Sequence, residues 1–203
     1  MEQYPSIGRV ATNDHMVVFD KLDGSNIRAE WNRKNGFTKF GTRKRLLEES
    51  EKPFGEAIGL IRETHADILD ELFRKQKYER ATAFFEFSGA NSFAGFHEQE
   101  AHEVTLFDVH VYKQGMLPPR EFLKIFERKV ATPPVLYEGK ANEKFIRSVK
   151  ESTLEGMTFE GVVCKGGWDS RKRLISYKVK SQAWLSKLKT KYQDTPEIYE
   201  KLK

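Results

Sequence analysis

The chain has 203 residues, 38% hydrophobic and 32% charged, which suits one ordinary domain with its own core and excludes a disordered chain. Its 35 basic and 30 acidic residues leave a net charge of +5, which excludes a ribosome-like basic tail but permits a localised basic surface. The single cysteine, Cys164, excludes a disulfide framework and a cysteine-rich zinc site. Because the sequence shows no signal peptide and no membrane-length apolar run, we expect a cytoplasmic protein that does not enter membranes.

The first half of the chain predicts three strands and one long helix. Alternating and β-branched residues indicate strands over residues 16–22, 26–31 and 37–41. The turn residues Asp23, Gly24 and Ser25 predict that the first two strands form an antiparallel hairpin. Apolar residues spaced by three and four predict a helix over residues 54–76.

The second half mixes strands and helices without regular βαβ alternation. We expect strands over 80–87, 104–112, 159–165 and 173–180, and helices over 120–129, over 142–150 and from Ser181 onward. This order predicts an α+β fold of largely antiparallel sheets, organised as a single domain over residues 1–203. No glycine-rich phosphate loop of a standard type is present in the sequence.

Lys21 carries the strongest local signal, because it ends a predicted strand just before a tight Asp-Gly turn. That position directs the amine into a cleft. A lysine amine is a nucleophile only when it is deprotonated, so such a site needs burial or cationic neighbours. Taken alone, the pattern is more often a surface lysine beside a hairpin turn.

Other segments supply groups that complement an amine nucleophile. Glu86 ends one predicted strand and Glu160 begins another. Lys178 and Lys180 share one face of a strand, because side chains alternate with period two, and their repulsion is tolerable if an anion lies between them. The chain therefore offers a candidate nucleophile, two carboxylates for a divalent metal ion, and two lysines for phosphates.

In this order the segments resemble the covalent nucleotidyltransferase superfamily of polynucleotide ligases and mRNA capping enzymes. The resemblance covers residues 4–184. The matching segments, motifs I, III, IIIa, IV and V, are residues 21–24, 85–89, 105–109, 160–163 and 178–180. Five motifs in the family's order are far more specific than any one of them. The resemblance implies a nucleotidyltransferase domain with an ATP cleft between antiparallel sheets.

Within the superfamily the details are most similar to RNA ligases of the RNA ligase 2 type. Asn26 follows the lysine at that group's spacing, where DNA ligases usually have arginine. Residues 42–45 resemble motif Ia, whose essential arginine aligns with Arg43, with Arg45 as the alternative. Residues 4–7 are also similar to the N-terminal segment of that group.

The resemblance implies a three-step ligation. Lys21 attacks the α-phosphate of ATP, expels pyrophosphate and holds AMP as a phosphoramidate. The AMP passes to a 5′-phosphate end, and a 3′-hydroxyl then attacks that end and releases AMP. Mg²⁺, with Mn²⁺ as a substitute, would bind Glu160 and Glu86, although Glu86 is also placed to hold the ribose.

The resemblance also assigns the remaining nucleotide contacts. Phe107 would stack on adenine, against the alternative that it is a core phenylalanine. Asn26 would contact the nucleotide. Lys178 and Lys180, assisted by Lys165, would bind the α-phosphate and stabilise its transition state.

Only 23 residues follow Lys180, too few for an OB-fold or a C-terminal helical domain, so we expect a minimal core that holds nucleic acid by itself. Between residues 165 and 191 nine basic residues face one acidic residue, which indicates a phosphate-backbone surface. Arg43, Arg45, Arg171, Lys172 and Arg173 are the nucleic-acid contacts that we expect.

The sequence therefore predicts a monomeric, ATP-dependent polynucleotide ligase that acts in nucleic-acid repair. It would join a 5′-phosphate end of RNA or DNA to a 3′-hydroxyl end of RNA, in a duplex or at a nick. A minimal DNA ligase is the main alternative and a capping guanylyltransferase comes next. A non-catalytic nucleic-acid-binding module is the alternative from another class.

Overall fold

The computed structural model describes all residues except 6, 9–13, 91, 93–98 and 170–172. The chain forms two compact units, each with its own sheet. The first unit comprises Met1–Ser6, Gly24–Pro133 and Ser170–Arg173, and the second comprises Ile7–Asp23, Pro134–Asp169 and Leu174–Lys203. Within the described residues, every helix is too short or too polar to span a bilayer.

A five-stranded antiparallel sheet forms the first unit, in the order β3-β2-β4-β5-β6. Its strands are β2 (Gly24–Asn32), β3 (Gly36–Thr42), β4 (Arg80–Ser88), β5 (Glu103–Val111) and β6 (Gly115–Met116). Alternate residues of β2 and β4, such as Ile27, Trp31 and Phe85, point to one face and form the core. The helix α3 (Pro119–Phe126) contributes Phe122 and Phe126 to that core.

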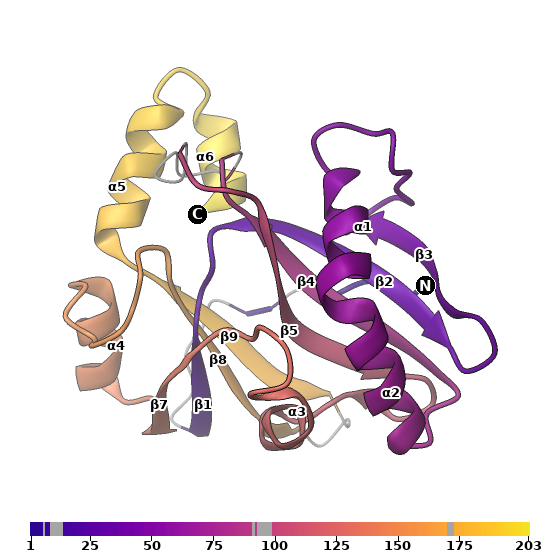
Figure 1. The fold of residues 1–203 in the computed structure, drawn as a ribbon. Coiled ribbons are helices and arrows are strands. Elements are labelled where there is room, and N and C mark those ends of the chain that lie inside the picture. Colours follow the sequence, from indigo (N-terminus) through magenta and orange to yellow (C-terminus); the bar gives the residue numbers. More distant parts are fainter. Residues whose placement is uncertain (6, 9–13, 91, 93–98, 170–172) are drawn as a thin grey trace. The chain divides into compact units, whose positions relative to one another are not determined.

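The predicted long helix is confirmed, with one irregular turn. It consists of α1 (Glu56–Ile61), the π-helical turn η1 (Arg62–Ala66) and α2 (Asp67–Lys75), which run on as one helix beside the sheet (Figure 1). The irregular turn buries His65, whose ring centroid lies 5.2 Å from that of Phe85. Burial lowers the pKa of the His65 imidazole, so His65 is a neutral core residue rather than a surface histidine.

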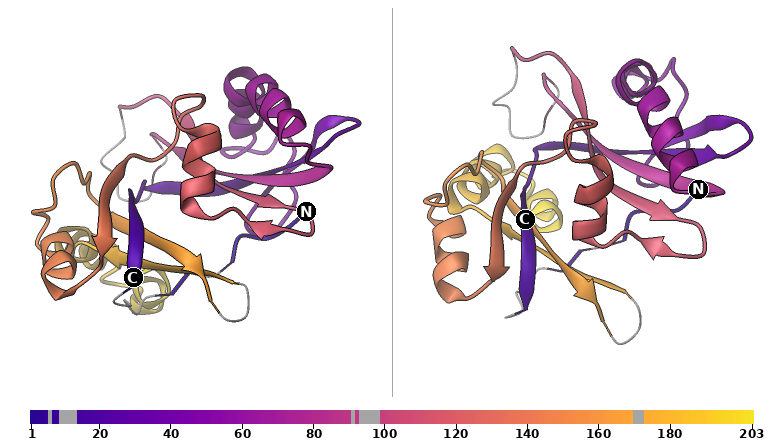
Figure 2. Two further views of the ribbon diagram at one scale, coloured as in Figure 1. Left: turned by 90° about the horizontal axis from the view of Figure 1, so that it is seen from below. Right: turned by 60° about the horizontal axis from the view of Figure 1, so that its bottom comes forward.

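The second unit contains a four-stranded antiparallel sheet in the order β7-β1-β8-β9. Its elements are β1 (His15–Asp20), β7 (Val135–Lys140), β8 (Gly161–Trp168), β9 (Leu174–Lys180), α4 (Glu143–Lys150), α5 (Gln182–Lys191) and α6 (Pro196–Leu202). The helix α4 lies against this sheet (Figure 2) and adds Phe145 and Val149 to its core. Asn142 and Ser181 cap α4 and α5 by accepting hydrogen bonds from backbone N–H groups, which fixes the start of both helices.

Cys164 lies fully buried in the core of the second unit. Burial raises the pKa of its thiol to about 12. The α+β class and the antiparallel sheets are also confirmed. The strand β7 and the helix α6 are elements that the sequence did not predict.

The predicted hairpin between the first two strands is wrong. β1 pairs with β7 and β8, whereas β2 pairs with β3 and β4 in the other sheet. The Asp23-Gly24 step therefore carries the chain from one sheet to the other instead of folding it back. At Gly24 a Cβ atom would lie 2.4 Å from the carbonyl oxygen of Phe87, so glycine is required by close backbone approach.

Candidate functional site

The register of the second sheet places Glu160 between two lysines. Gly161 begins β8 opposite Lys180 of β9, and on the other side the Lys21 N–H donates to the Gly161 carbonyl at 2.9 Å. Gly161 has a φ of +133°, and a Cβ there would lie 2.1 Å from the Val179 carbonyl oxygen. Only glycine fits this bend, so Gly161 fixes the backbone position from which the Glu160 side chain extends.

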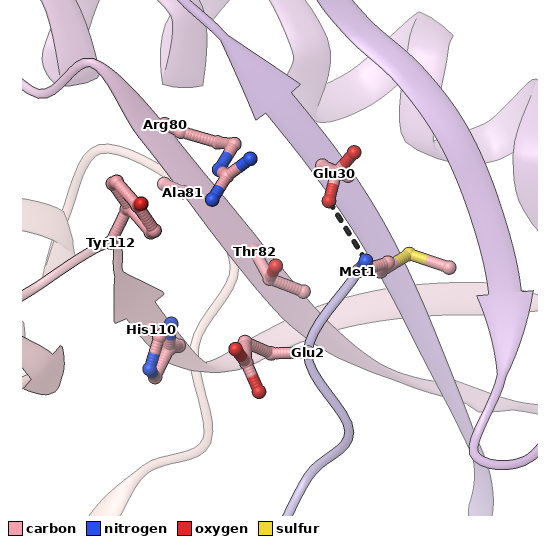
Figure 3. Close-up of a pocket in the computed structure, with 8 residues that line it drawn as sticks. All are labelled: Met1, Glu2, Glu30, Arg80, Ala81, Thr82, His110 and Tyr112. Atoms are coloured by element: carbon pink, nitrogen blue, oxygen red, sulfur yellow. Dashed lines mark ion pairs between the residues drawn. The ribbon is translucent and has the colours of Figure 1, made fainter.

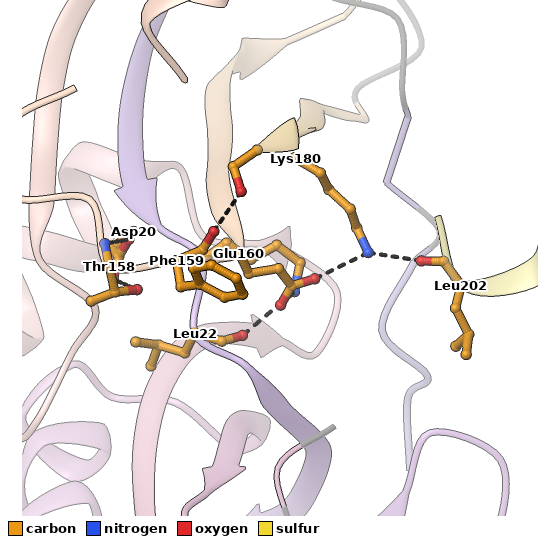
Figure 4. A network of polar contacts seen from close by, with 9 residues as sticks. Asp20, Leu22, Thr158, Phe159, Glu160, Lys180 and Leu202 are labelled. Atoms are coloured by element: carbon orange, nitrogen blue, oxygen red, sulfur yellow. Dashed lines mark hydrogen bonds and ion pairs between the residues drawn. The ribbon is translucent and has the colours of Figure 1, made fainter. Parts of the chain in front are cut away.

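Glu160 bridges Lys21 and Lys180, and its contact with Lys180 is drawn in Figure 4. The Lys21 Nζ lies 2.8 Å from Glu160 Oε2, and the Lys180 Nζ lies 3.1 Å from Glu160 Oε1. Glu160 is only 4% exposed, so both ion pairs are shielded from water. The protein thus supplies a carboxylate beside Lys180, placed between Lys180 and Lys21.

Three groups surround the Lys180 ammonium. Besides its ion pair with Glu160, it donates a hydrogen bond to the Leu202 carbonyl at 2.7 Å and lies 3.6 Å from the centre of the Trp184 ring. Burial lowers the pKa of Lys180 to about 8; Glu160 opposes this shift, while Lys21 and Lys178 add to it. The charge of Lys180 therefore changes near pH 8.

Lys165 and Lys178 lie on the same face of the sheet as this network. In β1, Met16 and Val18 point into the core, so Val17 and Phe19 point to the opposite face. Lys165 pairs with Val17, and its Nζ lies 4.8 Å from the centre of the Phe19 ring. We call the side chains of Lys21, Glu160, Lys165, Lys178 and Lys180 the lysine face. The sequence predicted each of these residues as part of one site, and the second unit brings them together.

The backbone that carries Glu160 is held on both sides. Thr158 donates two hydrogen bonds to Asp20, from its backbone N at 3.1 Å and from its hydroxyl at 2.8 Å (Figure 4). Ser181 donates from its hydroxyl to the Phe159 carbonyl at 2.7 Å and from its backbone N to the Glu160 carbonyl at 3.0 Å. Thr158 and Ser181 are positioning residues that the sequence analysis missed, although Ser181 was visible as a helix start.

A second group of predicted residues gathers on the first unit's sheet, on the face opposite its core. Asn26 of β2 lies directly opposite Glu86 of β4, and Glu86 lies opposite Thr105 of β5. β5 contains a bulge at Phe107, because Phe85 pairs with Leu106 while Phe84 pairs with Asp108. A bulge puts two successive side chains on one side of the strand, so Phe107 and Asp108 share this face. We call it the acidic face.

Tyr4 packs on the acidic face. Its hydroxyl donates a hydrogen bond of 2.8 Å to Asp108, and its ring centroid lies 5.0 Å from that of Phe107 and 5.1 Å from that of Phe84. Burial, followed by the Asp108 charge, raises the pKa of Tyr4 well above its usual value, so Tyr4 remains a donor. Phe107 itself is half-buried and lies outside the buried core cluster.

The residues predicted to contact nucleic acid differ in their exposure and in their ion pairing. Arg43 is exposed just beyond β3, whereas Arg45 forms an ion pair with Glu51. Arg173 is exposed, and Arg171 and Lys172 lie outside the described residues. Of the predicted basic run, Lys189 and Lys191 on α5 are exposed, but Lys165 is only 3% exposed. The run is therefore not one solvated surface.

A polar pocket lies at the other end of the acidic face (Figure 3). Its lining residues are Met1, Glu2, Glu30, Arg80, Ala81, Thr82, His110 and Tyr112. The N-terminal amine of Met1 lies 3.0 Å from Glu30, and burial lowers the pKa of the His110 imidazole. The pocket contains none of the predicted site residues.

In the described part of the chain, no group of three or more histidine, cysteine, aspartate or glutamate side chains is arranged to hold a metal ion. A magnesium ion does not need such a group, because it usually keeps several waters and binds one or two carboxylates together with substrate phosphates. Glu160 is a carboxylate suited to that mode, and its two oxygens are at present paired with lysines.

The sequence matches the family model described as RNA ligase over residues 14–180. The chain belongs to the RNA ligase family. The matched range includes both lysines that Glu160 bridges, and it ends at Lys180. No curated protein sequence matches the chain.

Solved RNA ligase structures share this fold. A point mutant of Naegleria gruberi RNA ligase with AMP and Mn matches with a TM-score of 0.68 at 16% identity, covering 92% of this chain and 58% of that one. The Naegleria gruberi RNA ligase with PPi gives the same TM-score and coverage at 17% identity. Another mutant of it, with ATP and Mn, gives 0.64 at 17% identity, covering 86% of this chain and 51% of that one. This chain thus spans little more than half the length of these ligases.

Proposed function

We propose that this member of the RNA ligase family is an ATP-dependent polynucleotide ligase that acts through a lysyl-AMP intermediate on Lys21. The observation that carries the proposal is the lysine face, where the Lys21 amine and the Lys180 ammonium contact the same buried carboxylate. Such a group offers a nucleophile, a cation for phosphate and a carboxylate within one hydrogen-bonded network.

In the first step the Lys21 nitrogen attacks the α-phosphorus of ATP, a phosphorus–nitrogen bond forms, and the bond to pyrophosphate breaks. An ammonium cannot attack, so Lys21 must first lose a proton. Its 2.8 Å contact with Glu160 stabilises the charged form, so that ion pair must be weakened before attack. The cations of Lys178 and Lys180 would stabilise the negative charge that develops on the phosphate oxygens.

We propose that Glu160 and Glu86 hold the divalent cation, Mg²⁺ or Mn²⁺, together with the ATP phosphates. When bound, the cation would neutralise charge on the phosphates and on the leaving pyrophosphate. Because both Glu160 oxygens contact lysines, metal binding there requires that at least one of these ion pairs be given up. The manganese in the Naegleria gruberi ligase structures supports the use of a divalent ion.

The acidic face supplies candidates for nucleoside recognition. Phe107 presents a half-buried ring outside the core cluster, which suits stacking on adenine. Asn26 and Glu86 lie opposite each other and offer amide and carboxylate groups for the ribose or the base. Tyr4 fixes the Phe107 ring from one side through its edge-to-face contact.

The substrate that we propose is a duplex or nicked nucleic acid with a 5′-phosphate end of RNA or DNA and a 3′-hydroxyl end of RNA. Exposed Arg43, Arg173, Lys189 and Lys191 are suited to contact its phosphate backbone, together with Arg171 and Lys172 from the sequence. We further propose that the enzyme acts as a monomer in the cytoplasm, in nucleic-acid repair. Its single cysteine, buried and unpaired, suits a reducing compartment.

The adduct on Lys21 tests this function directly. Incubation with ATP and Mg²⁺ should label the chain covalently with one AMP, and Lys21→Ala should abolish the label. Lys144→Ala removes an exposed lysine of α4 and serves as the matched control, which should keep the label. Lys21→Ala should still seal a strand that is already adenylylated, because that step does not use the amine. An undiminished label in Lys21→Ala would contradict the assignment.

The strand preference needs a separate experiment. A panel of nicked duplexes with RNA or DNA on each side of the nick should show sealing wherever the 3′-hydroxyl strand is RNA. Sealing confined to all-DNA nicks would establish a DNA ligase instead.

A further inference from the structure

The last turn of α6 contacts the lysine face. The Leu202 carbonyl accepts a hydrogen bond of 2.7 Å from the Lys180 Nζ, and both residues belong to the second unit (Figure 4). The last four carbonyls of a helix have no partner within the helix and carry partial negative charge, so a nearby ammonium stabilises them. Lys180 therefore holds the end of α6 in place.

The same ammonium is the group that the proposed function assigns to the α-phosphate of ATP. A lysine ammonium has three N–H donors. Oxygens of Glu160 and Leu202 lie 3.1 Å and 2.7 Å from its nitrogen, and the centre of the Trp184 ring lies 3.6 Å from it. A phosphate oxygen that approaches Lys180 therefore competes with groups that are already in place.

Two of these three groups are held firmly in the second unit. Trp184 is 3% exposed, and its backbone N–H donates to the Ser181 hydroxyl at 3.0 Å. Glu160 is 4% exposed, and its carbonyl accepts from the Ser181 backbone N–H at 3.0 Å. Ser181 is itself fully buried at the start of α5. Neither backbone can shift without disrupting this helix start.

The third group, at the end of α6, costs the least to displace. α6 has seven residues, which is shorter than a helix that is stable by itself in water. Thr195 makes no side-chain hydrogen bond at its N-terminus, and each of its described side chains is half-buried or exposed. A segment with so little burial opens locally at a low cost in free energy.

We propose that α6 is an autoinhibitory strap, in which the Leu202 carbonyl occupies Lys180 until the α-phosphate of ATP displaces it. The meaning of this contact rests on the proposed function, which gives the α-phosphate to Lys180. A charged phosphate oxygen binds an ammonium more strongly than a neutral carbonyl does, so bound ATP favours the open strap. Because the closed strap lowers the fraction of chains that can accept the phosphate, it weakens the apparent affinity for ATP.

The ATP dependence of AMP labelling tests the strap. Glu200 is exposed in α6, and Glu200→Pro should break the last turn by removing an N–H and by steric clash. The ATP concentration for half-maximal labelling should then fall by roughly threefold to tenfold, the factor that one ordinary hydrogen bond represents. An unchanged maximal label would show that this variant is folded.

Glu200→Ala is the matched control. It removes the same side chain and its ion pair with Lys203, which joins Oε2 and Nζ at 2.6 Å, but it leaves the helical backbone intact. The ATP concentration for half-maximal labelling should stay that of the natural chain.

Hydrogen exchange on the natural chain tests the strap without any substitution. AMP carries the α-phosphate but has no pyrophosphate to expel, so it can bind without forming the adduct. Saturating AMP should speed amide exchange in residues 196–203. Exchange in α4, which packs on the core of the same sheet, should stay unchanged.

Either experiment can overturn the strap. An equal or higher ATP requirement in Glu200→Pro would contradict it, and so would unchanged exchange of α6 in AMP. Slower exchange would make α6 a part of the closed nucleotide site instead. Absence of the AMP label from the natural chain would remove the proposed function and the strap with it, whereas a normal label with an unchanged ATP requirement in Glu200→Pro would remove the strap alone.

Discussion

The lysine face and the acidic face are both sheet surfaces opposite a core, yet their chemistry is opposite. On the first, in the second unit, Lys21 and Lys180 contact the Glu160 carboxylate, and Lys165 and Lys178 lie on the same face. The second, in the first unit, has Glu86 and Asp108 among the aromatic rings of Tyr4, Phe84 and Phe107. Cations stabilise phosphates, whereas flat rings and hydrogen-bond acceptors recognise a nucleoside. The first face is therefore suited to phosphate groups and the second to a nucleoside.

Replacing the bridging carboxylate should have the largest effect. Glu160→Gln keeps the shape but removes the charge that Lys21 and Lys180 share, and it removes the proposed metal ligand. We expect the rate of AMP labelling to fall by about a hundredfold or more. The Lys180 pKa should also fall further below its present value of about 8, because Glu160 raises it. A labelling rate near that of the natural chain would show that AMP transfer to Lys21 does not require the Glu160 carboxylate.

Removing an aromatic ring from the acidic face should act on nucleotide affinity more than on chemistry. Phe107→Ala should raise the KM for ATP by about tenfold, with a smaller change in kcat, if the ring stacks on adenine. Phe84→Leu is a control, because Phe84 is fully buried and also contacts Tyr4. It should lower stability with less change in KM. A loss confined to stability in Phe107→Ala would make that ring structural.

The pH dependence of kcat/KM for ATP should report the charge of Lys180 on the lysine face. The Lys180 pKa of about 8 means that its ammonium loses its proton within the ordinary assay range. If Lys180 must be charged to bind phosphate, kcat/KM for ATP should fall several-fold as pH rises through about 8, against the rise expected from deprotonation of Lys21. Lys180→Arg should lack this fall, since arginine stays protonated. Lys178→Arg, on the same strand, should keep it.

The same lysine should make the protein more stable at alkaline pH. In the unfolded chain its pKa returns to about 10.5, so between about pH 8 and 10.5 the unfolded state binds more protons than the folded state. The free energy of unfolding contributed by this group therefore rises across that window. Urea titrations at both ends of the window should show the rise, and Lys180→Met should abolish it.

The smallest effect is expected from the hydroxyl of Tyr4. Tyr4→Phe removes the hydrogen bond to Asp108 but keeps the ring contacts with Phe84 and Phe107. The free energy of unfolding should fall by about 1–2 kcal/mol, and AMP labelling should change little. Because the Tyr4 pKa is raised well above its usual value, its hydroxyl keeps its proton, and the loss should be the same at neutral and at mildly alkaline pH. A large kinetic loss would show that this hydroxyl contacts substrate.

Periodic elements were predictable from the sequence, and connections between them were not. The strands β4 and β5 and the long helix carry continuous apolar patterns over many residues. β7 and α6 are short and bury little, so they leave no such pattern. The false hairpin arose because an Asp-Gly turn looks the same whether the chain folds back or crosses to another sheet. The contact that decides, between Gly24 and Phe87, joins segments far apart in the sequence.

The site shows the same limit at the level of single residues. Lys21, Glu160 and Lys180 were found by motif order, and the structure joins them. Their pairing depends on strand register, which places Gly161 beside both lysines. Phe107 and Asp108 are neighbours in β5, where regular alternation would place them on opposite faces, and a bulge places them on one face. The support from Thr158, Ser181 and Leu202 depends on backbone groups or hydroxyls, which carry no distinctive sequence pattern.

The burial of Cys164 makes the natural chain an unreactive background for thiol labelling. Maleimide dyes react with thiolates, and a thiol with a pKa of about 12 that is fully buried offers almost none at neutral pH. A cysteine introduced at an exposed lysine would therefore be the only position that takes the dye. Lys39 in the first unit and Lys144 in the second are exposed places for such a pair. Energy transfer between two dyes there would report, in solution, any movement of one unit against the other when ATP or nucleic acid binds.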